Sequence, residues 1–282
     1  MEDSFLKAAD GGQRFAYKYA DNLSEYGELS DIQAQVAGEV ARLAGRAFEG
    51  NSMRMLDIGT GNGSLLSLVV QALNSRPNGC MIVEPDDSQR RRALSLMSQA
   101  NGLLISARRY LKNVHGVFGL ILASHVLYYI KDMHGFANDV ERLLASEGLL
   151  VIILRGPKCA SNIVRKIVRR HRGEKARLSR AAIIREFTPR CFAASCSAIT
   201  SHLSFSASEI DQFEVGMRNG FAYPNSLSRF IFWMGRLSPG EVVCDALRNE
   251  LLCYLRSQTK GGLLRLDLSD DIIVLQRRNH VA

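Results

Sequence analysis

The chain has 282 residues, 46% of them hydrophobic, and a formal net charge of +8 at pH 7. This length suits one α/β domain with an inserted or capping segment, and the hydrophobic content can fill a sizeable core. No run of 18 or more apolar residues is present, and the first five residues lack the basic flank and apolar stretch of a signal peptide. These features exclude a membrane-spanning chain and predict a soluble, cytoplasmic protein.

The six cysteines stand at positions 80, 159, 191, 196, 244 and 253, with no C-x-x-C pair and no histidine at zinc-ligand spacing. We therefore expect no metal site. The cysteines themselves are expected to be buried small hydrophobic residues in a reducing compartment.

Residues 1–50 have helical patterning and predict two helices. The second helix would carry its apolar residues on one face, namely Ile32, Val36, Val40 and Leu43. The segment between the helices, residues 22–31, is rich in turn-forming and acidic residues, among them Glu25 and Glu28. Taken alone, these two glutamates predict only exposed loop or helix-cap carboxylates.

The most informative stretch is residues 53–66, which read MRMLDIGTGNGSLL. An apolar strand is followed by a loop with glycine at positions 59, 61 and 63, and a helical pattern begins at once. Glycine lets the backbone take positive φ and lets a ligand come close, so the loop is suited to contact a ligand. Ser64 stands where a dinucleotide-binding fingerprint has its third glycine, which disfavours a pyrophosphate ligand.

Asp57 narrows the choice of ligand. A carboxylate beside the glycine loop repels a diphosphate but suits a ligand that carries an ammonium or sulfonium group. S-adenosyl-L-methionine (SAM) carries both groups. The alternative is a glycine-rich turn that serves packing alone.

A second short apolar strand, residues 80–84, ends in Glu84, which comes 21 residues after Gly63. In a βαβ unit, the acid at the tip of the second strand reaches the ribose of an adenosine and accepts hydrogen bonds from its hydroxyls. Glu84 fits that role, and together with the glycine loop it predicts a nucleoside site. The alternative is an ordinary strand-end glutamate.

From residue 53 to residue 154 strand and helix patterns alternate, which predicts right-handed crossovers and a parallel sheet covered on both faces. The predicted segments are 53–58, 65–74, 80–84, 87–100, 103–106, 117–123, 133–146 and 149–154. Ligands of such sheets bind beyond the carboxyl ends of the strands, where Asp57, Glu84 and the segment after Ala123 all fall.

The motif from Asp57 to Gly63, together with Val83-Glu84-Pro85, resembles motifs I and II of the class I SAM-dependent methyltransferases. The stretch Leu127–Asp132, followed by a helix and the strand Leu149–Ile153, resembles the histamine N-methyltransferase-like branch of that class. The resemblance implies an α/β fold with a doubly wound, seven-stranded, mostly parallel sheet of the Rossmann-like type. It also implies SAM as cofactor and S-adenosyl-L-homocysteine as product.

The resemblance further implies which residues contact the cofactor: Asp57, Gly59, Thr60, Gly61, Asn62, Gly63, Glu84, Pro85, Ser106 and Ser124. Ser106 ends the third predicted strand, near the expected adenine. Members of the family usually have an acid just after this strand, whereas here Ala107 and Arg108 follow, so the residues that recognise adenine are left open.

The segment after the fourth strand, Ser124 to Tyr129, should reach the mouth of the pocket. His125 is expected either to take a proton from the methyl acceptor, since imidazole titrates near neutral pH, or merely to cap the strand. Tyr128 and Tyr129 are candidate substrate contacts or core residues. In the resembled branch the N-terminal segment closes over the site, and Glu25 and Glu28 are the acids that could face an amine.

Beyond residue 155 the pattern becomes helical over 158–177 and 178–188, strand-like over 198–205, and mostly helical over 208–258. The last segment holds the only tryptophan, Trp233, either in a core or in the wall of a substrate pocket. Residues 271–276 predict a final strand, antiparallel at the sheet edge by the family pattern, with Gly261-Gly262 as the turn before it. The resulting organisation is a helical lid (1–50), a SAM-binding α/β domain (51–207 and 268–282) and a helical substrate cap (208–267).

Residues 155–190 hold twelve Lys or Arg against two Glu, a local balance of +10, and we name them the basic stretch. The stretch is either a solvated helix face or a surface that attracts an acidic substrate or carrier protein. A nucleic-acid partner is disfavoured because aromatic residues are not interleaved with the basic ones.

The sequence therefore predicts a SAM-dependent methyltransferase of small-molecule biosynthesis that acts by in-line transfer. Glu25, Glu28 and His125 favour an amine acceptor slightly over an oxygen acceptor, while the basic stretch favours an acidic one. The alternatives are a carboxyl or hydroxyl O-methyltransferase and a SAM-binding partner protein without catalysis.

Overall fold

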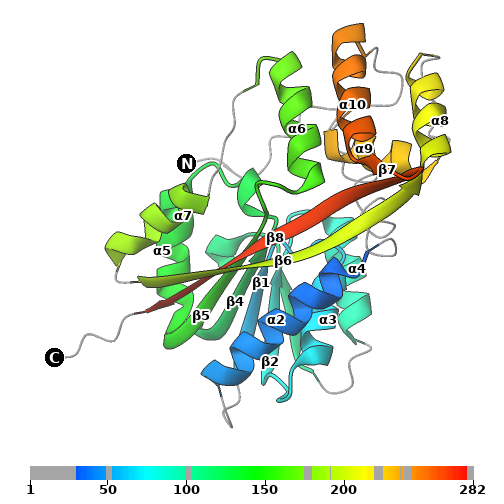
Figure 1. Cartoon of the computed structure of the whole chain (residues 1–282). Helices are drawn as coiled ribbons and strands as arrows, with labels where there is room; N and C mark the ends of the chain where they lie inside the picture. Colours follow the sequence, from blue (N-terminus) through cyan, green and yellow to red (C-terminus); the bar gives the residue numbers. More distant parts are fainter. Residues whose placement is uncertain are drawn as a thin grey trace.

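The computed structural model describes residues 30–48, 53–98, 103–174, 180–190, 192–218, 225–235, 237 and 243–277. Its strands are β1 (Arg54–Ile58), β2 (Gly79–Val83), β3 (Ile105–Arg108), β4 (Phe118–Ser124), β5 (Leu144–Arg155), β6 (Phe192–Ser206), β7 (Thr259–Lys260) and β8 (Leu263–Arg277). They form one eight-stranded sheet in the order β3-β2-β1-β4-β5-β8-β6, with β7 paired to β8 (Figure 1).

The α-helices are α2 (Ile32–Ala47), α3 (Ser64–Ala72), α4 (Asp87–Ser98), α5 (Met133–Leu143), α6 (Ala160–His171), α7 (Arg180–Phe187), α8 (Ala207–Arg218), α9 (Ser226–Gly235) and α10 (Asp245–Ser257). Three short 3₁₀ helices are η1 (Leu111–Asn113), η2 (Leu127–Tyr129) and η3 (Thr188–Arg190). One core cluster packs α2, α3 and α4 against one face of the sheet, and a second packs α5 and α7 against the other face.

Strands β1 to β5 are parallel, and both faces of the sheet are buried along most of β1, β2, β4 and β5, whereas the residues of β3 alternate between half-buried and exposed. In β4, Leu120 and Leu122 belong to the first core cluster, while Ile121 and Ala123 belong to the second. Alternate side chains of a doubly covered strand point into different cores, which is why these strands are apolar throughout. The predicted fold class, a Rossmann-like α/β sheet built from alternating strands and helices, is confirmed.

The order of the last strands differs from the prediction. β8 is antiparallel, as expected, but it lies between β5 and β6, so that β6 and not β8 is the edge strand. Both strands are also longer than predicted, since β6 pairs with β8 from Phe192 to Ser206 without interruption. The first part of β6 consists of small residues with weak strand preference, and its pairing with β8 outweighs that preference.

Three other boundaries also shift. β3 is Ile105–Arg108 rather than 103–106, and β5 begins at Leu144, where the sequence pattern continues the preceding helix to residue 146. Gly261 and Gly262 both have positive φ and form the turn between β7 and β8, as predicted. A two-residue hairpin turn favours such a pair because both of its central residues need positive φ.

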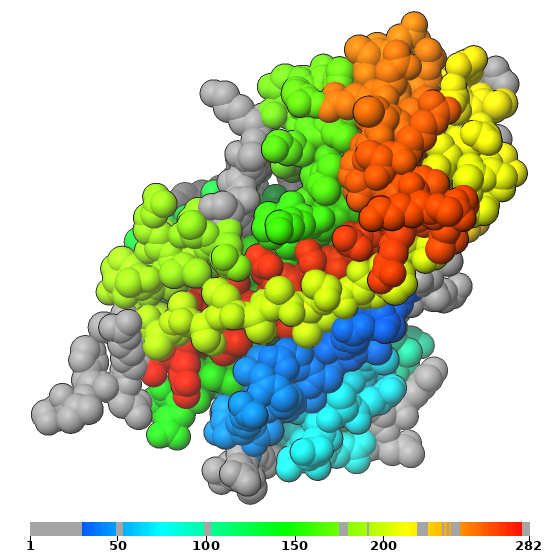
Figure 2. Space-filling view, in the orientation of Figure 1, coloured from blue at the N-terminus to red at the C-terminus, as the bar shows by residue number. Residues whose placement is uncertain are grey.

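Helices α6, α8, α9 and α10 gather above the sheet in Figure 1, at the start of β8. α6 packs mainly against α9 and α10, although the predicted boundaries assign it to the α/β domain. In Figure 2 β6 crosses this face of the molecule as a continuous band, with α2 on one side and the group of helices on the other.

The cysteine prediction was wrong in part. Cys80 and Cys159 are buried, whereas Cys196, Cys244 and Cys253 are exposed; all five are free thiols. Within the described ranges no helix combines the length and the hydropathy that a membrane crossing requires. In the same ranges no group of three or more His, Cys, Asp or Glu is placed to hold a metal ion.

Candidate active site

The glycine loop after β1 is shaped by the positive φ of Gly59 (74°), Gly61 (58°) and Gly63 (86°). A Cβ on Gly59 would lie 2.4 Å from Cγ2 of Val126, so the loop is pressed against the segment that follows β4. A Cβ on Gly61 would meet no atom within 4 Å. The chain therefore needs glycine at 59 for close packing and at 61 for its backbone conformation, and the side of the loop at Gly61 is open.

The end of the loop starts α3. The Asn62 Oδ1 accepts hydrogen bonds from the Ser64 backbone N–H (3.1 Å) and from the Ser64 hydroxyl (2.9 Å). A Cβ on Gly63 would stand 2.9 Å from the Cα of Ala93, which brings α3 and α4 close together. Gly59 and Gly63 thus allow close packing, whereas Gly61, which lies between them, leaves one side of the loop backbone open.

Asp57 lies one residue before the end of β1 and is only 4% exposed. Burial, with a contribution from the nearby Glu84, raises the pKa of its carboxyl from 3.8 to about 7, and the Thr60 side chain opposes this rise. Among the described residues no Lys, Arg or His forms an ion pair with Asp57. A buried carboxyl without a cation favours a ligand that supplies one.

Glu84 follows β2 and contacts the glycine loop directly. Its Oε2 accepts the Gly61 N–H at 2.8 Å, and its Oε1 accepts the Asp86 N–H at 3.0 Å. Burial raises the pKa of Glu84, and these two backbone donors partly offset the rise. Each carboxylate oxygen has a second lone pair, so Glu84 can hold the loop and still accept hydrogen bonds from a ligand hydroxyl.

Three of the remaining predicted cofactor residues adjoin this edge of the sheet. The Thr60 hydroxyl donates to the Asp57 carbonyl at 3.1 Å, Pro85 follows Glu84, and Ser124 ends β4. Ser106 is in the interior of β3, opposite Met81, because β3 extends to Arg108. The residue at the carboxyl end of β3 is therefore Arg108, and contact of Ser106 with the cofactor stays a prediction.

His125 directly follows β4 and has a positive φ of 53°, the only non-glycine residue with positive φ in the described part of the chain. Its backbone N–H donates to the Ile153 carbonyl at 2.9 Å. The ring Nε2 is 3.3 Å from Oδ2 of Asp270, while the buried Nδ1 has no hydrogen-bond partner within the part of the chain that the structure describes. Burial, followed by the charge of Arg155, lowers the pKa of His125, although Asp270 opposes this effect.

Asp270 and Arg155 complete the surroundings of His125, and the sequence analysis did not single out either as a site residue. Arg155 ends β5 and pairs with Asp270 across the antiparallel ladder, with an Nη1–Oδ1 distance of 2.7 Å. Burial would raise the pKa of Asp270, but Arg155 and His125 bring it below its ordinary value. The available signal was an acidic pair, Asp270-Asp271, next to a strongly apolar strand.

Tyr128 packs against this cluster. Its ring is nearly parallel to that of His125, at 9° and a centroid distance of 6.4 Å, and its hydroxyl accepts the Arg155 N–H at 2.7 Å. Tyr129 lies in η2 and Trp233 in α9, but the side chain of Trp233 is outside what the structure describes. Glu25 and Glu28 also lie outside the described residues, so their role stays a prediction.

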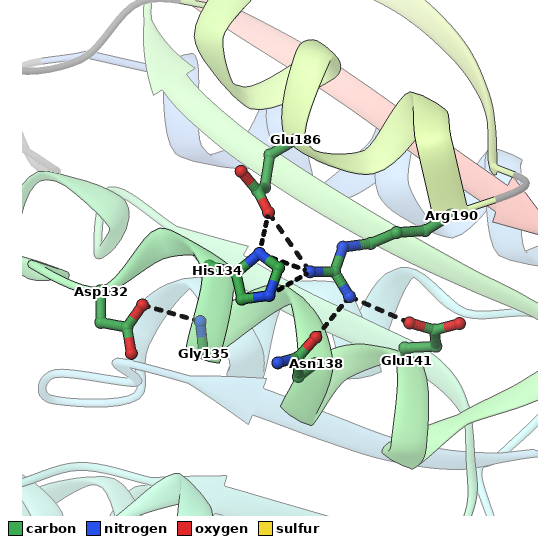
Figure 3. A network of polar contacts seen from close by, with 7 residues as sticks. All are labelled: Asp132, His134, Gly135, Asn138, Glu141, Glu186 and Arg190. Carbon is green, nitrogen blue, oxygen red and sulfur yellow. Dashed lines mark hydrogen bonds and ion pairs between the residues drawn. The ribbon is translucent and has the colours of Figure 1, made fainter.

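Several of the described charges of the basic stretch form ion pairs. Arg155 and Arg180 face Asp270 and Asp271, while Arg170 and His171 of α6 pair with Glu250 of α10. Figure 3 shows how Arg190 joins η3 to its neighbours; its partners are Glu186 on α7 and the α5 residues His134, Asn138 and Glu141. These pairs link helices to one another and to β8.

The arrangement at the carboxyl ends of β1, β2 and β4 fits SAM. Pairing of Ile58 with both Val83 and Ala123 brings the three strand ends to one edge of the sheet. Asp57 offers a buried carboxyl to an ammonium group, the loop at Gly61 is open, and Glu84 lies beside it. This donor set matches the cationic amino-acid end and the sugar hydroxyls of the cofactor.

Comparisons with known proteins agree with this geometry. A family model described as a methyltransferase domain matches residues 29–194. A search of curated proteins gave no match to the sequence. Among solved structures, the fold is similar to a proposed methyltransferase from Bacillus halodurans, with a TM-score of 0.55 and 10% identity over 86% of this chain and 99% of that chain.

It is also similar to the YcgJ protein of Bacillus subtilis, with a TM-score of 0.52 and 14% identity over 86% of this chain and 99% of that chain. At such identities these similarities show the fold alone. None of these matches points to the histamine N-methyltransferase-like branch, so that finer resemblance stays a prediction. Because the family model spans more than half of the sequence, the chain belongs to the methyltransferase domain family and is a SAM-dependent methyltransferase.

Proposed function

We propose that the enzyme methylates a small molecule held beyond the carboxyl ends of β4 and β5, next to His125. SAM, when bound, would supply a sulfonium methyl group for in-line displacement by the lone pair of the acceptor, with the thioether of S-adenosyl-L-homocysteine as the leaving group. The protein's part in such a displacement is mainly orientation, which can contribute about 7–11 kcal/mol. The glycine loop and Val126 are in contact, so the cofactor residues and His125 lie on adjoining segments.

The single observation that carries the proposal is that His125 combines a neutral imidazole with a ring nitrogen that has no hydrogen-bond partner among the described residues. Its lowered pKa keeps the imidazole neutral near pH 7, and the ring nitrogen in question is the buried Nδ1. A neutral imidazole can accept the proton that an N–H or O–H acceptor loses on methylation, and such general-base assistance contributes about 10²–10⁴-fold in rate. Its positive φ is a conformation that non-glycine residues adopt at local energetic cost and that is frequent at active sites.

Nitrogen remains slightly ahead of oxygen as the acceptor atom, because His125, Glu25 and Glu28 are groups that can take the proton that an amine loses on methylation. The charges near His125 favour an amine that is neutral when bound: Asp270 is already paired with Arg155, and Asp271 with Arg180. A protonated amine would need a further acid from elsewhere, and Glu25 and Glu28 are the candidates from the sequence.

A second candidate is an O-methyltransferase acting on an acidic small molecule. It is favoured by three arginines near Tyr128 and the two aspartates: Arg155, Arg180, and Arg165, whose guanidinium is 5.9 Å from the centre of the Tyr128 ring. Arginine forms paired hydrogen bonds with carboxylates and phosphates. The many internal ion pairs of the basic stretch favour a small acidic substrate over a carrier protein.

The test is methyl transfer from SAM to a panel of neutral amines, aliphatic diamines, phenols and carboxylic acids, with S-adenosyl-L-homocysteine formation as the readout. The proposal predicts that at least one neutral amine or hydroxyl compound is methylated by the wild type and that His125→Asn reduces this turnover. His134→Asn, in the exposed network of Figure 3, is the matched control and should retain activity. Equal turnover by His125→Asn and the wild type would overturn the role of His125.

A further inference from the structure

The side chain of Asp270 makes two contacts that use different oxygens. Its Oδ1 faces Arg155 Nη1 at 2.7 Å and its Oδ2 faces His125 Nε2 at 3.3 Å. An ionised carboxylate only accepts hydrogen bonds, so the imidazole nitrogen that faces it carries the ring proton. In a neutral imidazole the other nitrogen then has the lone pair, and here that nitrogen is the buried Nδ1, which has no hydrogen-bond partner in the described ranges of the chain.

From this geometry we propose that Asp270 is a positioning residue: it holds His125 in the tautomer with the proton on Nε2, so that Nδ1 is the atom that takes the acceptor's proton. The inference rests on the proposed function of His125 and names the atom that performs it. During the step the acceptor's N–H or O–H bond breaks, its electron pair stays on the heteroatom, and a new N–H bond forms at Nδ1. The resulting imidazolium lies against the negative charge of Asp270.

The position of Asp270 in the sheet explains why it can play this part. β8 is antiparallel to β5, and the ladder pairs Arg155 directly with Asp270, at the same sheet edge where β4 ends in Ser124. Asp270 is only 3% exposed, so water does not compete for its oxygens. Successive side chains of a strand point to opposite faces, and Asp271 accordingly pairs with a different residue, Arg180.

Further contacts fix Arg155 and the ring of His125. The Asn162 side-chain amide donates to the carbonyls of Arg155 (3.0 Å) and Gly156 (2.8 Å), and the Arg155 N–H donates to the Tyr128 hydroxyl. The Tyr128 ring is stacked with the imidazole, so the ring plane is held while Asp270 sets the tautomer. Hydrogen bonds that orient a catalytic histidine in this way are worth a large factor in turnover, as the aspartate of the serine-protease triad shows.

The first test reads the tautomer without any activity measurement. The full-length protein is labelled with ¹⁵N-histidine, and the ring nitrogens are observed by two-bond ¹H–¹⁵N spectra at pH 7.5, the signals of His125 being those lost in His125→Asn. We expect a protonated Nε2 and an unprotonated Nδ1 in the wild type. The opposite tautomer in the wild type would overturn the inference without the need for any variant.

Asp270→Asn is the informative substitution, because an amide keeps the size of the side chain but can donate to Nε2 as well as accept from it. We expect the single tautomer to be lost in Asp270→Asn and kept in Asp271→Asn, the neighbouring aspartate and matched control. If the loss of the charge at position 270 prevents folding, the double variant Arg155→Met, Asp270→Asn removes both charges of the pair and is examined in the same way.

Kinetics with an accepted substrate complete the test. Asp270→Asn should lower kcat by about 100-fold or more while the Kd for SAM stays within about twofold of the wild type, since only the proton acceptor is disturbed. If Asp270→Asn loses the single tautomer but His125→Asn keeps full activity, the proposed function is refuted. The contact between Asp270 and His125 would still be supported. An inactive His125→Asn beside an Asp270→Asn variant with unchanged tautomer and kcat would refute this inference alone.

Discussion

The two halves of the site are built from the sequence in different ways. The cofactor half, which comprises Asp57, the glycine loop and Glu84, comes from two consecutive strand–loop units of the chain. The acceptor half comprises His125, Tyr128, Arg155 and Asp270, and its last two members are 115 positions apart. The sequence shows a motif for the first half because its residues lie close together in the chain. The residues of the second half come together only when β8 pairs with β5.

The halves also differ in charge balance. In the cofactor half burial raises the pKa of both carboxyls, to about 7 for Asp57, and Asp57 has no cation partner among the described residues. In the acceptor half Arg155 and His125 bring the pKa of Asp270 below its ordinary value in spite of burial. The first half therefore favours a ligand that brings positive charge, while the second is already compensated and suits a neutral or acidic acceptor.

The largest effect that separates the halves is expected from His125→Asn. Asparagine tolerates positive φ better than most residues, so the backbone is kept while the proton acceptor is removed. Turnover should fall by about 100-fold or more, and the Kd for SAM should change less than about twofold. Single-turnover kinetics and calorimetry measure the two quantities. An equal loss of turnover and cofactor affinity would mean that His125 supports the structure of both halves.

The next largest effect is expected at position 59, where the glycine loop of the cofactor half packs against Val126, the residue after His125. An alanine at position 59 would bring its Cβ within 2.6 Å of Val126 Cβ and would have to adopt a φ of 74°. We expect Gly59→Ala to lower the free energy of unfolding by about 2–4 kcal/mol, as overpacking and positive φ add together. Chemical denaturation measures this loss. Val126→Gly removes both the Cβ and the Cγ2 that the new methyl group would meet, so Gly59→Ala should cost less stability in a Val126→Gly background. An equal cost in both backgrounds would show that backbone strain is the whole cause.

The difference between the halves also decides how much the sequence could predict. Asp57 and Glu84 were assigned correctly to one sheet edge because strand, loop and helix signals adjoin them in the chain. His125 was placed at the pocket mouth for the same reason, at the end of a strongly apolar strand. Asp270 could not be predicted as a site residue, because its contacts depend on which strand lies next to β5. The local sequence pattern does not determine the order of strands in a sheet.

Strand lengths show the same limit. The prediction began the last strand at residue 271, where the apolar run starts, but β8 begins at Leu263. Residues 263–270 alternate between more exposed and buried positions because one side faces α6 and the other helices, while 271–275 are buried between both cores and Gln276 is exposed. The apolar run marks the doubly covered part of a strand and not its whole extent.

A smaller loss should be confined to the cofactor half in Asp57→Asn. The amide keeps the size of the side chain but removes the negative charge, so SAM should bind about 1–3 kcal/mol more weakly. Asp87→Asn, an exposed acid at the start of α4, is the control and should bind SAM as the wild type does. Calorimetric titration measures both. If Asp57→Asn binds SAM as tightly as the wild type, the Asp57 carboxylate does not contribute to cofactor binding. The proposed difference in charge balance between the two halves of the site would then fail.

The smallest effect is a pH dependence that Asp57 alone should confer. Its pKa is about 7 in the folded protein against an ordinary value of 3.8, so between these pH values the folded state binds more protons than the unfolded state. Stability of the free protein should therefore fall as the pH rises through this window. A cationic ligand favours the ionised carboxyl, so S-adenosyl-L-homocysteine, which carries the ammonium group, should raise the unfolding temperature more at pH 7.5 than at pH 5.5. Asp57→Asn should remove that difference while the contribution of Glu84 remains, and an identical pH dependence in the two proteins would place the titrating carboxyl elsewhere.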